Sequence, residues 1–287
     1  MTALFAAVRA LHFASLMTAF GASALLLQAR GIGVDGARFR RLLLVAAVIA
    51  LLTALAWLCL VAGEMTGDPA AAIDGTTILL VVRQTFYGHV FLLRLVLLAG
   101  LCGFSLLKDA WLPRTLTAGA ALALLGLTSH AAASGSPQYE TLRAANDALH
   151  LIAAGFWLGG LVVLLPHVTP PRDLPRAVAL LRLFSRWGVV SVAILLAAGT
   201  VNGIAILGAP GMRWSATYAT WLAIKIVLAM LMVALALTNR FAVLPGLVRG
   251  DADARETIPL TVVAELSCAV LIVAIVGFLG VIAPMEM

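Results

Sequence analysis

Eight long apolar runs, separated by shorter polar stretches, form the pattern of this 287-residue chain. Each run is close to the roughly 20 residues that an α-helix needs to cross a hydrocarbon core about 30 Å thick. Backbone groups in lipid must be hydrogen-bonded within the protein, which favours helices. The pattern predicts an all-α, polytopic integral membrane protein with eight transmembrane helices, at residues 3–27, 42–62, 86–107, 115–134, 144–165, 187–207, 218–238 and 257–283.

Composition supports this prediction, and the distribution of charge indicates how the helices are oriented across the membrane. Hydrophobic residues make up 63% of the chain and charged residues 11%, against about 25% charged residues in globular proteins. The net charge of +6 does not indicate a nucleic-acid partner, because the basic residues are spread over short loops. Of the 19 Lys and Arg residues, 13 lie in four alternate loops, at 28–41, 108–114, 166–186 and 239–256. The positive-inside rule then places these loops in the cytoplasm and both termini outside.

The chain also carries a weak internal repeat. The matching residues are His12 with His150 and Gly21 with Gly159 at an offset of 138, and Arg94 with Lys225 at an offset of 131. The matches join helices of the same predicted direction. We therefore expect two pseudo-repeated four-helix halves, residues 1–140 and 141–287, that form one membrane domain and are related by an axis along the membrane normal.

Four of the five histidines lie inside or at the ends of predicted spans, all toward the outer side; they are His12, His89, His130 and His150. Neutral imidazole is a good ligand for copper, zinc and haem iron, and helix bundles assemble such sites from separate helices. A lone intramembrane histidine is more often an interhelical hydrogen-bonding residue. Four at similar depth instead predict one shared metal site near the outer face.

Asp147 precedes His150 by three residues, so the two share one face of the predicted helix. The carboxylate could orient the imidazole or serve as an oxygen ligand. Two other interpretations remain open, an acid at a helix N-terminus and a salt bridge to Arg9 of the first half.

Three further charged residues lie deep inside predicted spans. Arg94 and Lys225 are about two turns inside their helices, and Glu265 is similarly far from the cytoplasmic end of its own. Charges at such depth are costly and are functional candidates, although the two basic residues can also snorkel toward the outer surface. We expect these residues, and Trp157 beside the small-residue pair Gly159-Gly160, to support the metal site or line a pathway inward.

Several segments together resemble the CopD family of bacterial inner-membrane copper-resistance proteins. The resemblance covers most of the chain and is strongest from about 125 to 240. The matching segments are Ser129-His130-Ala131, Asp147 to His150, Trp157 to Leu161, Arg182 to Ser185, Gly199 to Asn202, Thr217 to Lys225, Asn239-Arg240, and Thr85 to Gly88 with Arg94.

The resemblance implies a multi-pass protein of the inner membrane that is not an enzyme. Such a protein accepts copper on the periplasmic side, often from a separate soluble CopC-like carrier, and passes it toward the cytoplasm. The resemblance also implies that His130, His150 and His12 handle the metal, whereas His89 rests on the topology argument alone. The oxidation state of the copper is left open, because imidazoles do not select strongly between Cu(I) and Cu(II).

Two alternatives remain at this point. Two histidines at one level on separate helices could ligate haem b axially, which would make the chain an electron-transfer protein. A purely structural or assembly subunit would use the same histidines as interhelical hydrogen-bond donors.

Overall fold

The protein is helical throughout residues 2–128, 137–169, 173–207 and 215–282, which a computed structural model describes, and these residues contain no strand. Within these described ranges, seven helices are long and apolar enough to cross a membrane. They are α1 (Thr2–Gln28), α2 (Gly36–Thr66), α4 (Phe86–Leu106), α6 (Pro137–Val168), α7 (Leu174–Leu207), α8 (Ala216–Thr238) and α10 (Ala252–Leu279). The multi-pass membrane architecture predicted from the hydropathy pattern is therefore confirmed.

The fourth predicted span, residues 115–134, is described only in part. Helix α5 (Trp111–Ala123) is 13 residues long, and a 3-10 turn, η3 (Gly126–Thr128), follows it. The rest of that span lies outside the described residues. The count of eight crossings therefore stays a prediction.

Other short helices lie between the spans. They are η1 (Ala29–Ile32), η2 (Pro69–Ile73), α3 (Gly75–Gln84), the π-helical segment η4 (Asn239–Val243) and α9 (Leu244–Arg249). Helix α3 occupies a stretch that we expected to be a loop. The Asp74 carboxylate caps it by accepting hydrogen bonds from the backbone N–H groups of Thr76 and Thr77. Hydropathy missed this helix because its 10 residues are too few to span a membrane.

Several helices begin well before their apolar runs, and α2 and α7 are clear examples. Helix α2 begins at Gly36, where Asp35 caps it, and α7 begins at Leu174. Apolar runs mark only the part of a helix that lies in hydrocarbon, whereas arginine-bearing turns continue the same helix through the interface. The predicted starts at 42 and 187 therefore mark the hydrocarbon boundary and not the helix end.

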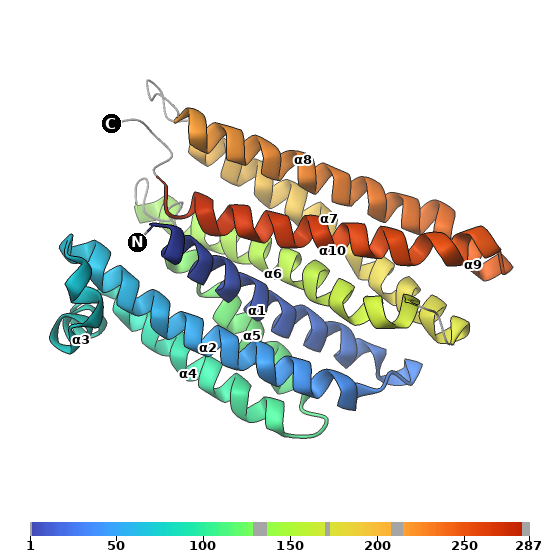
Figure 1. Ribbon diagram of the computed structural model, residues 1–287, viewed down its shortest axis with the longest axis horizontal. Coiled ribbons are helices and arrows are strands. Elements are labelled where there is room, and N and C mark those ends of the chain that lie inside the picture. Colours follow the sequence, from blue (N-terminus) through green and yellow to red (C-terminus); the bar gives the residue numbers. More distant parts are fainter. Residues whose placement is uncertain (1, 129–136, 170–172, 208–214, 283–287) are drawn as a thin grey trace.

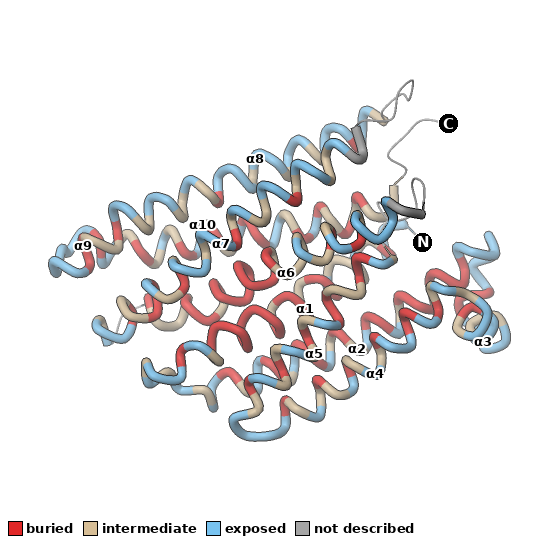
Figure 2. Tube along the Cα trace, turned by 180° about the vertical axis from the view of Figure 1, so that it is seen from behind, coloured by how far each residue is buried: buried red, intermediate tan, exposed pale blue. Residues whose placement is uncertain are grey.

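Helices α1 and α6 lie side by side in the centre of the bundle (Figure 1), and α1 also packs against α2, α5 and α10. Figure 2 shows that the buried positions concentrate on these central helices, while α7 and α8 are largely exposed. The α1–α6 contact is very close, because a Cβ added at Gly21 would lie 2.9 Å from Cα of Gly159. Only glycine allows the two backbones to approach this closely.

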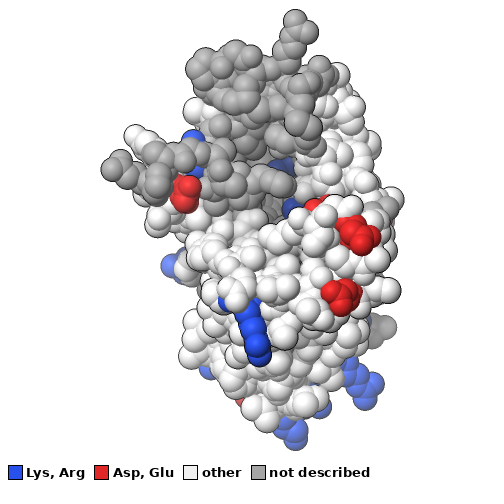
Figure 3. Space-filling model, turned by 90° about the vertical axis from the view of Figure 1, so that its left-hand side faces the viewer, with Lys and Arg blue, Asp and Glu red and all other residues white. Residues whose placement is uncertain are grey.

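The two ends of the bundle differ in charge. Helix α1 begins and α10 finishes at one end, which we call the N-terminal end; η1, the α4–α5 connection and α9 lie at the other, the arginine-rich end (Figure 1). Figure 3 looks onto the N-terminal end and shows both acidic and basic side chains on its surface, with further basic atoms set back in a recess. The basic loops thus gather at one end, as the sequence pattern predicts.

Candidate functional site

His12 lies on α1 and is completely buried against α2 and α4. Its Nδ1 lies 3.0 Å from the carbonyl oxygen of Ala50 and 3.0 Å from Oγ1 of Thr53, both on α2. Its Nε2 accepts a hydrogen bond of 2.6 Å from the guanidinium of Arg94 on α4. Because arginine only donates, Nε2 carries no proton, and the ring is a neutral imidazole with its hydrogen on Nδ1. Both ring nitrogens are therefore engaged by the protein.

Aromatic rings surround this contact. The Trp57 ring meets the His12 ring edge to face, with centroids 5.5 Å apart. Arg94 lies over the Phe91 ring at 4.5 Å and faces Trp57 at 5.6 Å, while Arg9 lies over Trp57 at 4.4 Å. Cation–π contacts partly compensate the cost of placing two guanidinium groups inside an apolar bundle. We call His12, Thr53, Trp57 and Arg94 the His12 cluster.

His150 lies on α6 and faces α7 and α8 instead. A methyl group at Gly199 of α7 would lie 3.6 Å from its Cε1, so the imidazole rests against a helix that has no side chain there. The ring interacts with the backbone carbonyl of Leu195 on α7, and its buried Nδ1 meets no partner with full hydrogen-bond geometry within the described chain. The ring is therefore packed against α7, and its Nδ1 is not fully engaged by the residues that the structure describes.

Charged and amide side chains stand around this imidazole. Lys225 of α8 lies close enough to interact electrostatically with both His150 and Asp147. One turn away, Asn146 donates hydrogen bonds to Oδ1 of Asn202, at 2.6 Å, and to the carbonyl of Ala198, at 3.0 Å. These bonds tie α6 to α7. We call His150, Asp147, Lys225, Asn146 and Asn202 the His150 cluster.

Glu265 anchors a third polar group nearer the arginine-rich end. Its carboxylate is 2% exposed and accepts hydrogen bonds from Nε1 of Trp157, at 3.1 Å, and from Nδ2 of Asn239, at 2.6 Å. Thr261 in turn donates to Oδ1 of Asn239 at 2.6 Å. The group links α6, α10 and the π-helical segment η4; we call these four residues the Glu265 cluster.

The π-helical segment gives this cluster its geometry. The wider turn from Asn239 to Val243 allows Asn239 to face Glu265, while the next residue, Arg240, donates to the carbonyl and the hydroxyl of Ser185 on α7. Insertions of this kind in α-helices are frequent at functional positions. Two of the sequence segments quoted above thus meet in space at this end of α8.

The remaining histidines lie elsewhere. His89 is exposed at the start of α4, with Nε2 3.2 Å from the carbonyl of Arg83. His130 lies outside the described residues. His167 lies at the opposite, arginine-rich end of α6, where it stacks on Phe39. Among the described residues, no three His, Cys, Asp or Glu side chains converge as a metal-binding group.

The structure thus does not bring His12, His89 and His150 into one shared site. His12 belongs to a cluster of α1, α2 and α4, whereas His150 belongs to a cluster of α6, α7 and α8. Counting spans places residues on one side of a membrane but does not say toward which neighbour each helix turns a side chain. The metal-binding role of each histidine stays a prediction.

The sequence reasoning missed several polar partners. Thr53 and Trp57 complete the His12 cluster, and Asn146 and Thr261 belong to the other two. Asn239 had been quoted only for the family resemblance and not as a site residue. An uncharged polar residue inside an apolar run is the signal that could have found them. That signal is weak, because such residues also serve as ordinary interhelical contacts.

Comparison with known proteins gives consistent matches along the chain. Residues 1–141 match the family model described as the N-terminal domain of copper resistance protein D-like proteins, and residues 178–279 match copper resistance protein D. Copper resistance protein D of Pseudomonas syringae pv. tomato is 33% identical over 264 residues, which cover 86% of this chain and 84% of that protein. Inner membrane protein YebZ of Escherichia coli K12 is 29% identical over 285 residues, 97% of each chain. No solved structure matches the chain.

Proposed function

This chain belongs to the copper resistance protein D family, and from that premise we propose that it is a copper transport protein of the inner membrane. It takes copper at the periplasmic face through membrane-embedded histidines and passes it toward the cytoplasm. Its relatives carry the words copper resistance and inner membrane in their names, and its described residues form the long apolar helices that a transporter of this kind requires.

The observation that carries the proposal is the imidazole of His150. Its buried Nδ1 meets no partner with full hydrogen-bond geometry among the described residues. The ring lies on the face of α6 that also bears Asp147, in the N-terminal half of that helix. A neutral imidazole nitrogen suits copper, and an adjacent carboxylate is the usual means of orienting such a ligand. His130 belongs to the same proposed set.

His12 has a different role in this proposal. Its Nε2 is the ring nitrogen that copper would need, and the Arg94 guanidinium occupies it. Copper can reach His12 only when Arg94 moves away. The contact therefore acts as a closed gate, and copper bound at the His150 cluster would reach His12 only in a second, rearranged state.

The Glu265 cluster provides the onward step. A buried carboxylate held by two neutral donors can accept a proton or a cation without first breaking an ion pair. It lies toward the arginine-rich end, the predicted cytoplasmic side. We propose that Glu265 exchanges a proton as copper leaves.

A duplicated architecture suits alternating access. The first-half helices α1, α2, α4 and α5 can be matched in order to the second-half helices α6, α7, α8 and α10. Under this matching, four helix–helix contacts have a counterpart: α1–α2 with α6–α7, α1–α5 with α6–α10, α1–α10 with α5–α6, and α4–α5 with α8–α10. The α2–α4 contact has no comparable counterpart between the described parts of α7 and α8. The four corresponding pairs support two halves that rock about the α1–α6 contact.

The orientation follows the basic loops, with both termini periplasmic. The N-terminal end then faces any copper carrier, and exposed acids such as Glu64, Asp68 and Asp74 lie there. A soluble CopC-like protein is the proposed donor.

The test measures copper binding by the purified full chain and copper uptake by proteoliposomes. We expect His150→Ala to lose most binding and uptake. His167→Ala is the matched control, because His167 is the same residue type at the opposite end of the same helix, and it should behave as wild type. Equal copper binding by the wild type and the His150→Ala variant would remove the proposed site.

The visible spectrum of the same preparation tests the haem b alternative. Bis-histidine ligation of haem b needs two imidazoles that face one gap, and His12 and His150 turn to different helices. We expect no Soret band; a Soret band with reducible α and β bands would instead support the electron-transfer function.

A further inference from the structure

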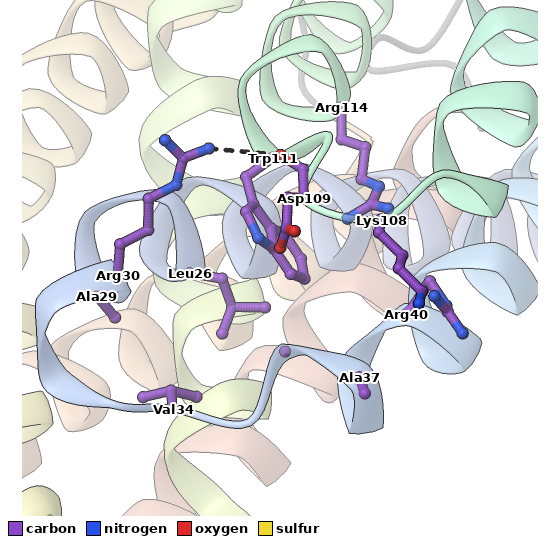
Figure 4. Close-up of a pocket in the computed structure, with 11 residues that line it drawn as sticks. Leu26, Ala29, Arg30, Val34, Ala37, Arg40, Lys108, Asp109, Trp111 and Arg114 are labelled. Carbon is purple, nitrogen blue, oxygen red and sulfur yellow. Dashed lines mark hydrogen bonds between the residues drawn. The ribbon is translucent and has the colours of Figure 1, made fainter.

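A basic pocket of about 490 Å³ opens at the arginine-rich end, between η1, the start of α2 and the α4–α5 connection (Figure 4). The copper proposal does not use it. Its polar lining consists of Arg30, Arg40, Lys108, Asp109 and Arg114, and Trp111 forms an apolar wall. The pocket is therefore lined by four cationic side chains and one carboxylate.

Arg114 gives this pocket a buried, preorganised hydrogen-bond donor. Its side chain is completely buried, and it lies over the Trp111 ring at 4.5 Å. Its Nε donates to the carbonyl of Phe104 at 3.0 Å, and one terminal nitrogen donates to the carbonyl of Leu107, so it holds the last turn of α4. Its other terminal nitrogen is buried and has no partner in the described chain. A buried guanidinium N–H without an acceptor indicates a ligand that accepts.

The protein neutralises the positive charge of the pocket only in part, because the Asp109 carboxylate, which interacts electrostatically with Arg114, faces four cationic side chains. The ion pair between Arg176 and Asp173 does not involve the residues that line the pocket. Arg30 donates to the backbone oxygen of Asp109, at 3.5 Å, and not to its carboxylate. An anionic ligand would supply the missing charge.

The surroundings of the pocket indicate which kind of anion it binds. Arginine forks suit phosphate oxygens, and basic pockets between transmembrane helices at the cytoplasmic side recognise anionic lipid headgroups. Leu106, Leu107 and Leu112, on the same α4–α5 corner, are 65%, 54% and 50% exposed. Exposed leucines beside a basic pocket match a molecule with a charged head and acyl chains. We propose that this pocket binds the phosphate of an anionic phospholipid headgroup.

The test uses the full chain in detergent, titrated with phosphatidylglycerol, with phosphatidylcholine and with inorganic phosphate, and measures retained lipid by native mass spectrometry. Phosphatidylglycerol should bind more tightly than phosphatidylcholine. The double variant Arg40→Gln/Lys108→Gln, which leaves the buried Arg114 in place, should weaken phosphatidylglycerol binding about tenfold or more. Arg255→Gln, an exposed arginine of α10 outside the pocket, should leave it unchanged.

Each other outcome contradicts the proposal in a distinct way. Equal retention of the two lipids, or equal weakening by Arg255→Gln and by the double variant, would show that the pocket does not select the anionic headgroup. Displacement of phosphatidylglycerol by equimolar inorganic phosphate would show that a soluble phosphate is the ligand and would overturn the lipid assignment. Melting temperatures of the variants check that each one is folded.

Discussion

Arg94 of α4 donates a hydrogen bond of 2.6 Å to Nε2 of His12 in α1, across 82 positions of sequence. The contact is buried, and Thr53 and Ala50 engage the opposite side of the same ring. One imidazole thereby joins three helices. The same contact also occupies the nitrogen that a metal would use, so it links packing to the proposed transport.

The energy of this contact is measurable by a double-mutant cycle. We expect His12→Ala and Arg94→Met each to destabilise the protein, because each leaves a buried partner without its hydrogen bond. The double variant should lose less unfolding free energy than the two single variants lose together. The expected coupling energy is about 1 to 2 kcal/mol, the upper range for interhelical hydrogen bonds in membranes. Unfolding in mixed micelles gives these values, and strict additivity would mean that the bond contributes nothing.

Removing Arg94 should also open His12 to copper. We expect Arg94→Met to gain copper binding that a further His12→Ala substitution abolishes, while transport falls because the gate no longer closes. In the presence of Arg94, His12→Ala should bind copper nearly as well as wild type. If His12→Ala alone lost as much binding as His150→Ala, the guanidinium would not be closing the site.

Substitution of Gly21 tests the α1–α6 contact. Gly21→Ala places a Cβ within 2.0 Å of the Gly155 carbonyl oxygen, so the helices must separate, at a cost of about 1 to 3 kcal/mol or more. Gly188→Ala is the control, because no atom lies within 4 Å of a Cβ at that position. The melting temperature should fall for the first variant and stay level or rise for the second. Equal melting temperatures would mean that the helices are not held this close.

Glu265 should matter for both stability and transport. Glu265→Ala leaves the donors on Trp157 and Asn239 without an acceptor, which costs about 1 to 3 kcal/mol for each. Glu265→Gln retains one amide oxygen as acceptor and should fold better, but it cannot release a proton. We therefore expect copper binding to survive in Glu265→Gln while proteoliposome uptake fails. Wild-type uptake by this variant would exclude proton exchange at this residue.

His89 is placed to meet incoming copper first and not to hold it at the final site, since its ring is exposed at the N-terminal end. We expect His89→Ala to slow copper loading at low copper concentration while equilibrium affinity changes by less than about twofold, as for most surface substitutions. Stopped-flow loading and equilibrium dialysis separate these quantities. A loss of bound copper at saturation would instead make His89 a ligand of the final site.

The fold followed closely from the chain, and the shared site did not. The start of α1, α4 and α8 lay within two residues of the predicted spans, because apolar length alone sets where a helix can cross a membrane. Short helices such as α3 were missed because capping by Asp74, and not hydropathy, defines them. The pairing of Arg94 with His12 was missed because it joins residues on separate helices.

By itself, the sequence determined a multi-pass helical membrane protein, the end of the bundle at which the basic residues gather, and the family to which the chain belongs. These properties depend on composition and order, which the hydrophobic effect and the cost of burying charge translate directly into architecture. Only the tertiary structure decided that His12 and His150 turn to different helices, that Arg94 covers His12 and that Glu265 meets Trp157 and Asn239. The rotation of each helix about its axis depends on packing against all its neighbours at once, and a nearly uniformly apolar helix carries too little asymmetry to show that rotation in its sequence.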